Sequence, residues 1–294
     1  MFRPKKYHPL LSSASLAWIS LAALADGAVY STNFDSFSDG NIAGQDGWAV
    51  NATTLDSFKP GEIIPSFGYS PWGSKSATIG YSTGLSVPKV FVSRTYPSGG
   101  TTPLLPSGGG PNTTFRTDLY LVDSNSTVST PSVPTDAVRD TFGFRLEDSS
   151  HNNLFSFILT PDSQVEFPES DKVFHYASWS TGTNAPVNIY PVPPQKATEE
   201  GYFYDLVVTF SAASSGNDVA FAATFGGQSF NGIIPDAATS SGIATVGAFW
   251  EPSDATNPGS NYMLFDNLSL VPEPSAALLG LLGASCVLVR RRRD

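Results

Sequence analysis

Acidic side chains are the first candidates for chemistry in this sequence, because cleavage of a glycosidic bond needs two carboxyl groups that flank the bond. Two adjacent acidic pairs are present, Glu147-Asp148 and Glu199-Glu200, and Glu166 stands alone. Each pair lies where a strand-like segment meets a polar turn, which favours solvated turn charges over a catalytic pair. The sequence therefore offers no clear acidic constellation for hydrolysis.

Histidine and cysteine chemistry has even fewer candidates. His8 lies in an N-terminal apolar segment, His151 in a polar turn and His175 in a strand-like segment, which is too scattered for a zinc site. No H-E-x-x-H, G-x-S-x-G, phosphate-loop or dinucleotide-binding motif is present. The only cysteine, Cys286, lies in a C-terminal apolar run, so the chain between the two ends has neither disulfides nor thiolate metal ligands.

Four tryptophans are candidate platforms for a sugar ring, because sugar sites combine aromatic faces with a few polar groups. They are Trp48, Trp72, Trp179 and Trp250. The alternative is that each is buried or half-buried in the core. The sequence leaves both interpretations open.

The charges of the chain are unevenly distributed. The 294 residues carry a net charge of −10, whereas residues 29–271 hold 9 basic and 23 acidic residues and therefore a net charge of −14. Nucleic-acid binding needs cationic contacts with phosphates, so this acidic interior argues against nucleic acid as a partner. It is compatible with solubility and with binding of cations or neutral sugars.

The N-terminus has the pattern of a secretory signal peptide over residues 1–25. A basic start (Arg3, Lys5 and Lys6) precedes an apolar stretch that ends at Ala25. Small residues three positions and one position before the cut suit cleavage after Ala25. We therefore expect recognition by the secretion machinery and an exported protein. A buried or membrane-bound N-terminal helix is the alternative.

The C-terminal segment, residues 272–294, combines a proline-rich start, an apolar run and a basic end. Pro272, Glu273 and Pro274 come first, a run of 14 residues follows over 276–289, and four arginines close it, Arg290, Arg291, Arg292 and Arg293. The arginines favour the cytoplasmic side of a membrane, which leaves the rest of the chain outside. A bilayer span needs about 20 residues, so this hydrophobic helix is expected to be a temporary anchor.

This succession of Pro-Glu-Pro, short apolar helix and arginine cluster resembles the PEP-CTERM sorting signal of Gram-negative, exopolysaccharide-producing bacteria. The resemblance implies an exosortase-type membrane protease as a partner, which removes the tail. It also implies a precursor anchored in the inner membrane and a mature protein at the cell surface or in the extracellular matrix. The alternative is an ordinary C-terminal anchor.

Between the two ends, residues 29–271 show strand-like segments and no strong helical period. The segments are rich in aromatic and β-branched residues and cover residues 114–122, 140–147, 154–159, 202–210, 219–225, 245–250 and 262–270. Polar turns predict a hairpin of 140–147 with 154–159 and pairing of 202–210 with 219–225. Residues 97–111 and 181–196 are rich in turn-forming residues and predict long surface loops. The sequence therefore predicts an all-β fold, a β-sandwich or jelly roll.

Two end motifs make this region resemble the concanavalin A-like, or laminin-G-like, jelly rolls of exported bacterial proteins. The first comprises residues 34–37 and 44–48, and the second comprises residues 264–270, Leu-Phe-Asp-Asn-Leu-Ser-Leu. The resemblance implies that the first and last strands pair. It also implies a structural calcium ion near the paired ends, where Asp35 and Asp266 are the matching carboxylates. The alternative is that Asp266 only turns or caps the last strand.

The same jelly rolls include both lectins and glycoside hydrolases, so the fold resemblance does not choose a function. The Glu-x-Asp-x-x-Glu string that the hydrolases carry on one strand is absent. We expect an exported, non-catalytic surface or matrix protein. A lectin-like module for exopolysaccharide is the alternative, and a glycoside hydrolase is a third possibility.

Overall fold

The structure is a computed structural model of the chain, and it describes residues 30–51, 62–65, 73–80, 90–95, 112–122, 141–160, 175–182, 184–192, 196–197, 202–214, 216–237, 242–251 and 262–272. The predicted signal helix and C-terminal hydrophobic helix lie outside these residues. Within them, no helix has the length and apolar character needed to cross a bilayer.

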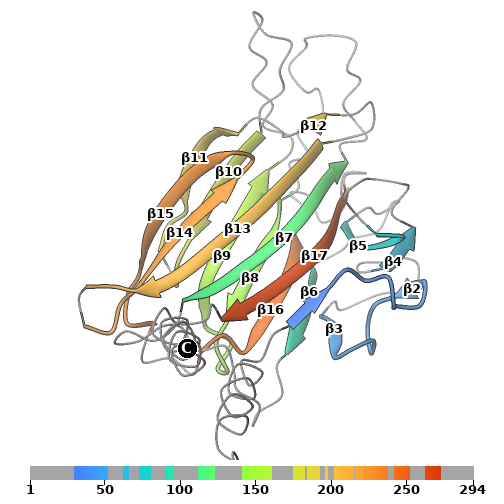
Figure 1. Cartoon of the computed structure of the whole chain (residues 1–294), viewed down its shortest axis with the longest axis horizontal. Coiled ribbons are helices and arrows are strands. Elements are labelled where there is room, and N and C mark those ends of the chain that lie inside the picture. The colour runs from blue at the N-terminus through green and yellow to red at the C-terminus, as the bar shows by residue number, and fades with distance from the viewer. Residues whose placement is uncertain are drawn as a thin grey trace, which may run out of the picture.

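The described strands form two antiparallel sheets (Figure 1). The ten-stranded sheet consists of β1 (Tyr30–Thr32), β2 (Gly40–Asn41), β4 (Glu62–Pro65), β5 (Lys75–Gly80), β7 (Thr113–Val122), β12 (Lys196–Ala197), β13 (Tyr202–Ala212), β14 (Val219–Phe225), β15 (Gln228–Ile234) and β17 (Tyr262–Pro272). The seven-stranded sheet consists of β3 (Trp48–Asn51), β6 (Val90–Thr95), β8 (Thr141–Glu147), β9 (Asn153–Thr160), β10 (His175–Ser180), β11 (Val187–Val192) and β16 (Thr245–Glu251).

The strand order mixes distant parts of the chain. The larger sheet runs β15-β14-β13-β7-β17-β5-β4-β2, with β1 paired to β17 and β12 paired to β13. The smaller sheet runs β11-β10-β9-β8-β16-β6-β3. Because β17 lies in the middle of one sheet and β16 in the middle of the other, the last described strands complete both sheets.

Three predicted pairings are confirmed. β8 and β9 form a hairpin, in which Phe144 lies opposite Phe157. β13 pairs with β14, and the first strand pairs with the last, with Tyr30 opposite Leu270. Strand-like segments and turn chemistry located the first two pairings correctly, and the motif resemblance indicated the third.

The predicted loop over residues 181–196 is wrong in part, because it contains strand β11. Pro191 lies within that strand, and proline is tolerated at a sheet edge, where no partner strand needs its N–H. β11 is the last strand of its sheet. The other predicted loop, residues 97–111, lies outside the described residues.

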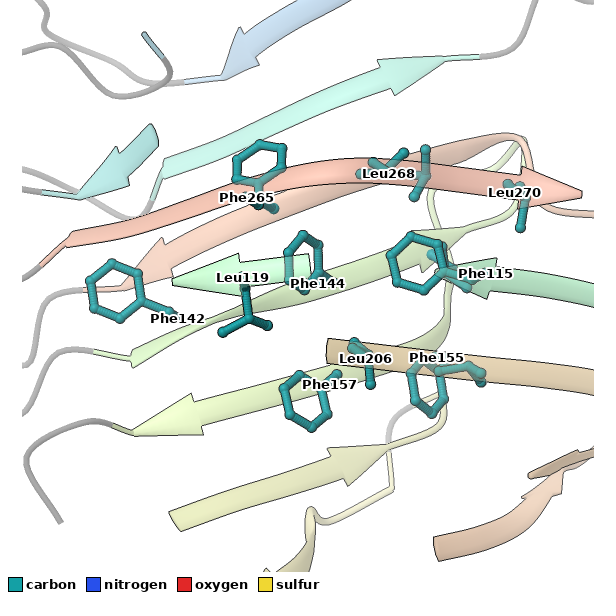
Figure 2. Packing of buried hydrophobic residues seen from close by; sticks show 14 of the residues in the cluster. Phe115, Leu119, Phe142, Phe144, Phe155, Phe157, Leu206, Phe265, Leu268 and Leu270 are labelled. Atoms are coloured by element: carbon teal, nitrogen blue, oxygen red, sulfur yellow. The ribbon is translucent and has the colours of Figure 1, made fainter. Parts of the chain in front are cut away.

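A single aromatic-rich core lies between the two sheets (Figure 2). Alternate residues of β8 contribute Phe142, Phe144 and Leu146, each at most 1% exposed. Leu206 and Phe265 reach the same core from β13 and β17 of the other sheet. The fold is therefore an all-β sandwich, with side chains of both sheets packed in its interior.

Candidate functional site

β17 changes partner in its middle, and this junction is the first candidate site. β5 pairs with β17 as far as Phe265, and β1 pairs with it from Leu268 onward. The register with β7 shifts between Asp266 and Ser269, and Asn267 has a positive φ of 49°. Such a bulge bends the strand and redirects side chains. It places Asp266 where the end of β1 meets the start of β5.

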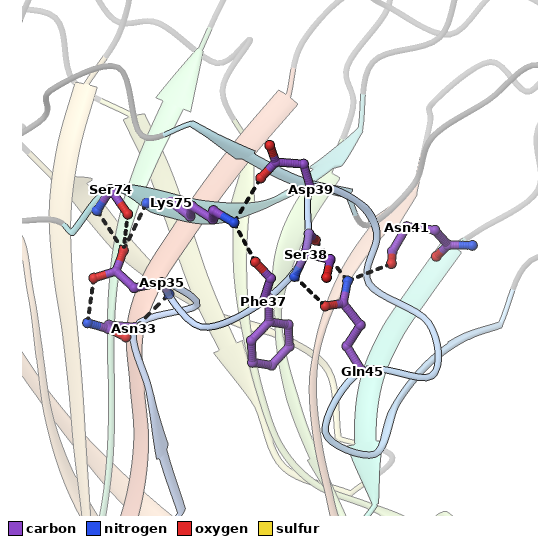
Figure 3. Close-up of polar contacts among 9 residues, drawn as sticks. All are labelled: Asn33, Asp35, Phe37, Ser38, Asp39, Asn41, Gln45, Ser74 and Lys75. Atoms are coloured by element: carbon purple, nitrogen blue, oxygen red, sulfur yellow. Dashed lines mark hydrogen bonds and ion pairs between the residues drawn. The ribbon is translucent and has the colours of Figure 1, made fainter.

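Asp35, in the loop after β1, connects that loop to the start of β5 (Figure 3). Its Oδ1 accepts hydrogen bonds from the Ser74 N–H at 2.6 Å, the Ser74 hydroxyl at 3.0 Å and the Lys75 N–H at 3.0 Å. Its Oδ2 accepts one from the Asn33 amide at 2.9 Å. Partial desolvation acts to raise the pKa of Asp35, but the bonds from Ser74 and Lys75 outweigh it and lower that pKa.

Asp266 is fully buried at the same junction. Its Oδ1 accepts the Asn267 N–H at 2.8 Å, and its Oδ2 accepts the Gly73 N–H at 3.4 Å. Burial raises the pKa of Asp266 to about 7; the two backbone N–H donors oppose this rise, and the nearby Asp35 and Asp118 add to it. Consecutive backbone N–H groups of Gly73, Ser74 and Lys75 thus bind the two carboxylates that the sequence placed at matching ends.

Sequence reasoning missed the third carboxylate of this junction. Asp118 lies on β7 directly opposite Asp266 and is 8% exposed. It accepts a hydrogen bond from the Asn267 amide at 2.8 Å, and Arg116 lies 3.7 Å away. Alternation along β7 indicates that Asp118 points away from the core, but only the register with β17 places it beside Asp266.

A second polar group at the junction was also missed. Ser76 follows Lys75 on β5 and is fully buried, and its hydroxyl has no hydrogen-bond partner. Ala77 pairs with Phe265, so continuing the register places Ser76 opposite Asp266 on the same face. Ser76 therefore places a buried hydroxyl oxygen beside the buried carboxylate of Asp266.

The residues of the first end motif stabilise the loop and the core. The Gln45 side chain accepts the Ser38 N–H at 2.7 Å and donates to the carbonyls of Ser38 and Asn41 (Figure 3). The Trp48 indole N–H donates to the Tyr30 hydroxyl at 2.8 Å inside the protein. This motif therefore folds the loop that presents Asp35.

The described tryptophans do not form an exposed aromatic surface. Trp48 is 2% exposed and Trp250 is fully buried, so neither offers a ring face to a sugar. Trp179 is partly buried, with its ring 4.8 Å from that of Phe221. Trp72 lies outside the described residues. The sequence alone did not predict which tryptophan side chains are buried between the two sheets.

The outward face of the seven-stranded sheet carries a second candidate site, centred on Arg145 of β8. Arg145 lies between Ser156 of β9 and Gly247 of β16, so small residues flank it on both neighbouring strands. Its guanidinium carbon lies 5.6 Å from the ring centre of Phe249 and 5.9 Å from that of Phe91. Its side chain is 29% exposed.

Two glycines make room for these aromatic rings. A Cβ at Gly143 would meet the Phe249 ring at 2.7 Å, and one at Gly247 would meet the Phe91 ring at 2.8 Å. Each ring therefore lies directly against the backbone of a neighbouring strand. The resulting surface combines Arg145, the partly exposed Phe91 and small polar residues.

Glu147 completes this group, and its position corrects a prediction. The pair Glu147-Asp148 was expected to be solvated, but the two residues are 5% and 8% exposed. Glu147 lies 3.5 Å from Arg145 Nη1 and 3.3 Å from His151 Nδ1. Asp148 instead holds the following turn through Asn152. The sequence did not reveal this burial because it depends on neighbouring strands.

One donor of Arg145 is unsatisfied. Its Nε is buried and has no hydrogen-bond partner. Buried N–H groups are nearly always paired, and leaving one unpaired costs about 1–3 kcal/mol. Glu199-Glu200 and Glu166 lie outside the described residues. Arg145 and the largely buried Glu147 form an ion pair on this face, and Glu251 of β16 is an exposed carboxylate on the same face.

Comparisons with solved structures find similar chains at low sequence identity. The chain is similar to the CBM2 module of the evolved Dit protein of Lactobacillus casei BL23 phage J-1, with 14% identity, 83% of this chain and 97% of that chain covered, and a TM-score of 0.41. It is similar to basic winged bean lectin, with 8% identity, 83% and 97% covered, and a TM-score of 0.43. It is similar to a β-glucanase catalytic domain from Podospora anserina, with 12% identity, 82% and 94% covered, and a TM-score of 0.43.

Sequence comparisons give no assignment: no family model matches the chain, and no curated protein matches its sequence. The class of protein is an all-β sandwich of two antiparallel sheets, and this class rests on the strand pairings themselves.

Proposed function

We propose that the chain is an exported, non-catalytic surface protein with a concanavalin A-like sandwich that binds carbohydrate on the outward face of its seven-stranded sheet. The observation that carries this proposal is the group formed by Arg145, Glu147 and Phe91. It combines hydrogen-bond donors, an acceptor and an aromatic ring on one sheet face. Exopolysaccharide is the proposed partner.

The chemistry of this group suits a sugar. A sugar hydroxyl donates and accepts hydrogen bonds at once, so a site needs both kinds of partner. Arg145 supplies only donors and Glu147 supplies acceptors, 3.5 Å apart. The ring of Phe91 offers an apolar surface for the C–H face of a pyranose.

The placement of Asp35 and Asp266 supports structural roles for these two carboxylates rather than cleavage. Asp266 is fully buried, and Asp35 uses both of its oxygens in hydrogen bonds that hold the chain together. These carboxylates have structural partners, whereas a hydrolase needs two carboxyl groups free to face a glycosidic bond.

We also propose structural calcium at the junction of Asp35 and Asp266. Within the described segments, no three His, Cys, Asp or Glu side chains are arranged as a metal site, so hydroxyl, carbonyl and water oxygens would have to complete the shell. The donors fit in kind, because calcium prefers carboxylate and other hard oxygen ligands. The unpartnered Ser76 hydroxyl and the buried Asp266 carboxylate both fit a cation there.

The proposed localisation at the cell surface rests on the sequence patterns of the N-terminal and C-terminal segments. Pro272 is the last residue of β17, and the rest of the sorting motif, with Arg290 to Arg293, lies outside the described residues. Export through the secretion machinery, transient membrane anchoring and removal of the tail by an exosortase-type protease follow from the resemblance. The mass of the mature protein from an exosortase-containing host tests this, since tail removal shortens the chain.

The carbohydrate proposal is tested by pull-down of the full-length protein with insoluble β-glucan, chitin and calcium-gelled alginate. Arg145→Gln keeps a polar end but shortens the side chain and removes its charge, and we expect it to weaken binding about 10–100-fold, because a hydrogen bond to a charged group contributes about 1.5–3 kcal/mol. Arg116→Gln is the matched control, because Arg116 forms a similar pair with Asp118 on the other sheet.

Equal loss of binding in both variants would contradict the proposed face. Binding to none of the polysaccharides, with and without calcium, would contradict carbohydrate binding altogether. Thermal unfolding of each variant shows whether a loss of binding comes from misfolding, since exposed Arg116 serves as the reference for a surface substitution.

A further inference from the structure

The four outermost strands of the two sheets differ in how they are protected against further pairing. An exposed edge strand presents free N–H and C=O groups, and proteins blunt it with charges, proline or short length. β2 has two residues, β3 has four, and β11 contains Pro191. β15 is seven residues long, Gln-Ser-Phe-Asn-Gly-Ile-Ile, with no charge and no proline. Among the described edges, β15 alone lacks all three devices.

The outer edge of β15 is open among the described strands. β15 ends the larger sheet and pairs with β14 only, and Figure 1 shows it as the outermost strand of that sheet. Ser229 and Asn231 are exposed. The strand is therefore both unprotected and accessible.

The hairpin that contains β15 determines which backbone groups point outward. Gly226 and Gly227 have φ values of 53° and 78°, as a two-residue type I′ turn requires. Its closing pair, Phe225 and Gln228, exchanges hydrogen bonds, and the pairs alternate from there. Ser229, Asn231 and Ile233 consequently direct their N–H and C=O groups away from β14. Asn231 is the middle one of the three.

Exposed apolar side chains lie on the same side of the sandwich. Among the described residues, the large hydrophobic side chains that are exposed are Val187 at 46% and Ile233 at 45%. Val187 is opposite Trp179 on β10, and the Trp179 ring lies against Gly232, the neighbour of Ile233. The open strand edge therefore lies beside uncovered apolar surface.

We propose that β15 pairs with β15 of a second copy of this chain, antiparallel and centred on Asn231. The chain between its two ends is acidic, with −14 over residues 29–271, so two copies carry like net charges that repel each other. The uncharged β15 can lie opposite itself without opposing like charges. A two-fold axis makes such an interface self-complementary, and the two larger sheets become one continuous sheet. This inference is independent of the carbohydrate proposal.

The dimer is tested by sedimentation of the full-length protein in a mild detergent. We expect a protein mass of twice the 31.2 kDa of the chain. Asn231→Pro removes one outward N–H and leaves the bonds to β14 intact, so the hairpin still forms and the mass falls by half. Circular dichroism confirms that the variant keeps its strands. A monomeric wild-type protein would overturn the proposal.

A cross-link keeps the proposal testable if the proline variant misfolds. With Cys286 replaced by serine, Asn231→Cys places two thiols opposite each other at the axis, where the Cα atoms of a hydrogen-bonded pair lie about 5.5 Å apart, within disulfide reach. Ala222→Cys is the control. Ala222 is exposed and lies opposite Asn231 on β14, so in each copy it is one strand, about 4.8 Å, further from the two-fold axis and the two thiols are too far apart to cross-link. A covalent dimer of Asn231→Cys only is expected. No cross-link, or equal cross-linking of both variants, would contradict pairing at β15.

Discussion

Replacing Phe265 by alanine is expected to lower the free energy of unfolding by about 3–5 kcal/mol, the range for truncating a buried phenylalanine. Phe265 is fully buried, and its ring lies 5.5 Å from that of Phe34, 6.1 Å from that of Trp48 and 5.7 Å from that of Phe144. It thus joins the N-terminal loop, the last strand and both sheets. Denaturant unfolding followed by tryptophan fluorescence measures the loss.

The matched control for this truncation is Thr224→Ala on β14, an exposed position of a strand in the same sheet. We expect a change within about 0.5 kcal/mol, as for surface substitutions in general. A loss below about 1 kcal/mol for Phe265→Ala would show that the aromatic cluster does not hold the chain ends to the core.

Asp266 is expected to make the protein less stable as the pH rises through neutrality in the presence of a chelator. Its folded-state pKa of about 7 lies above the ordinary value of 3.8, so between these values the folded state holds a proton that the unfolded chain releases. Stability is therefore highest near the lower end of this range and falls as the pH rises through about 7. One pKa unit corresponds to about 1.4 kcal/mol, so the total fall is up to about 4 kcal/mol.

Calcium is expected to reverse this loss. A metal ion binds the deprotonated carboxylate, so calcium raises the unfolding midpoint more at pH 8 than at pH 5. Asp266→Asn removes both the pH dependence and the calcium effect, whereas Glu251→Gln, at an exposed carboxylate on β16 of the other sheet, leaves both unchanged. A wild-type midpoint that changes with neither pH nor calcium would contradict a buried, cation-binding Asp266.

Local sequence patterns predicted the elements whose side chains alternate clearly. In the segment 140–147, Phe142, Phe144 and Leu146 alternate with Thr141, Arg145 and Glu147, which puts the two sets on opposite faces of the strand, as in the structure. The same alternation did not show that Gly247 and Ser156 flank Arg145, because strand order depends on pairing between distant segments. For that reason the burial of Glu147 was missed.

At the chain ends, too, local motifs predicted some contacts, whereas others depend on pairing between strands that are distant in the sequence. Motif resemblance indicated correctly that the first and last strands pair and that Asp35 and Asp266 lie near the same junction. Asp118 and Ser76 come from two further strands, and neither has a local pattern that points to the junction. The exposure of a tryptophan ring is equally non-local: Trp250 is enclosed by both sheets.

Binding without cleavage is the central claim, and a single time course tests it most directly. Full-length protein is incubated with each polysaccharide in calcium, and bound protein and newly formed chain ends are measured together. We expect saturable binding that weakens in Arg145→Gln, with no new reducing or unsaturated ends above the protein-free control. Steady release of such ends by the wild-type protein, lost on replacement of Glu147 by glutamine, would contradict the claim and identify an enzyme.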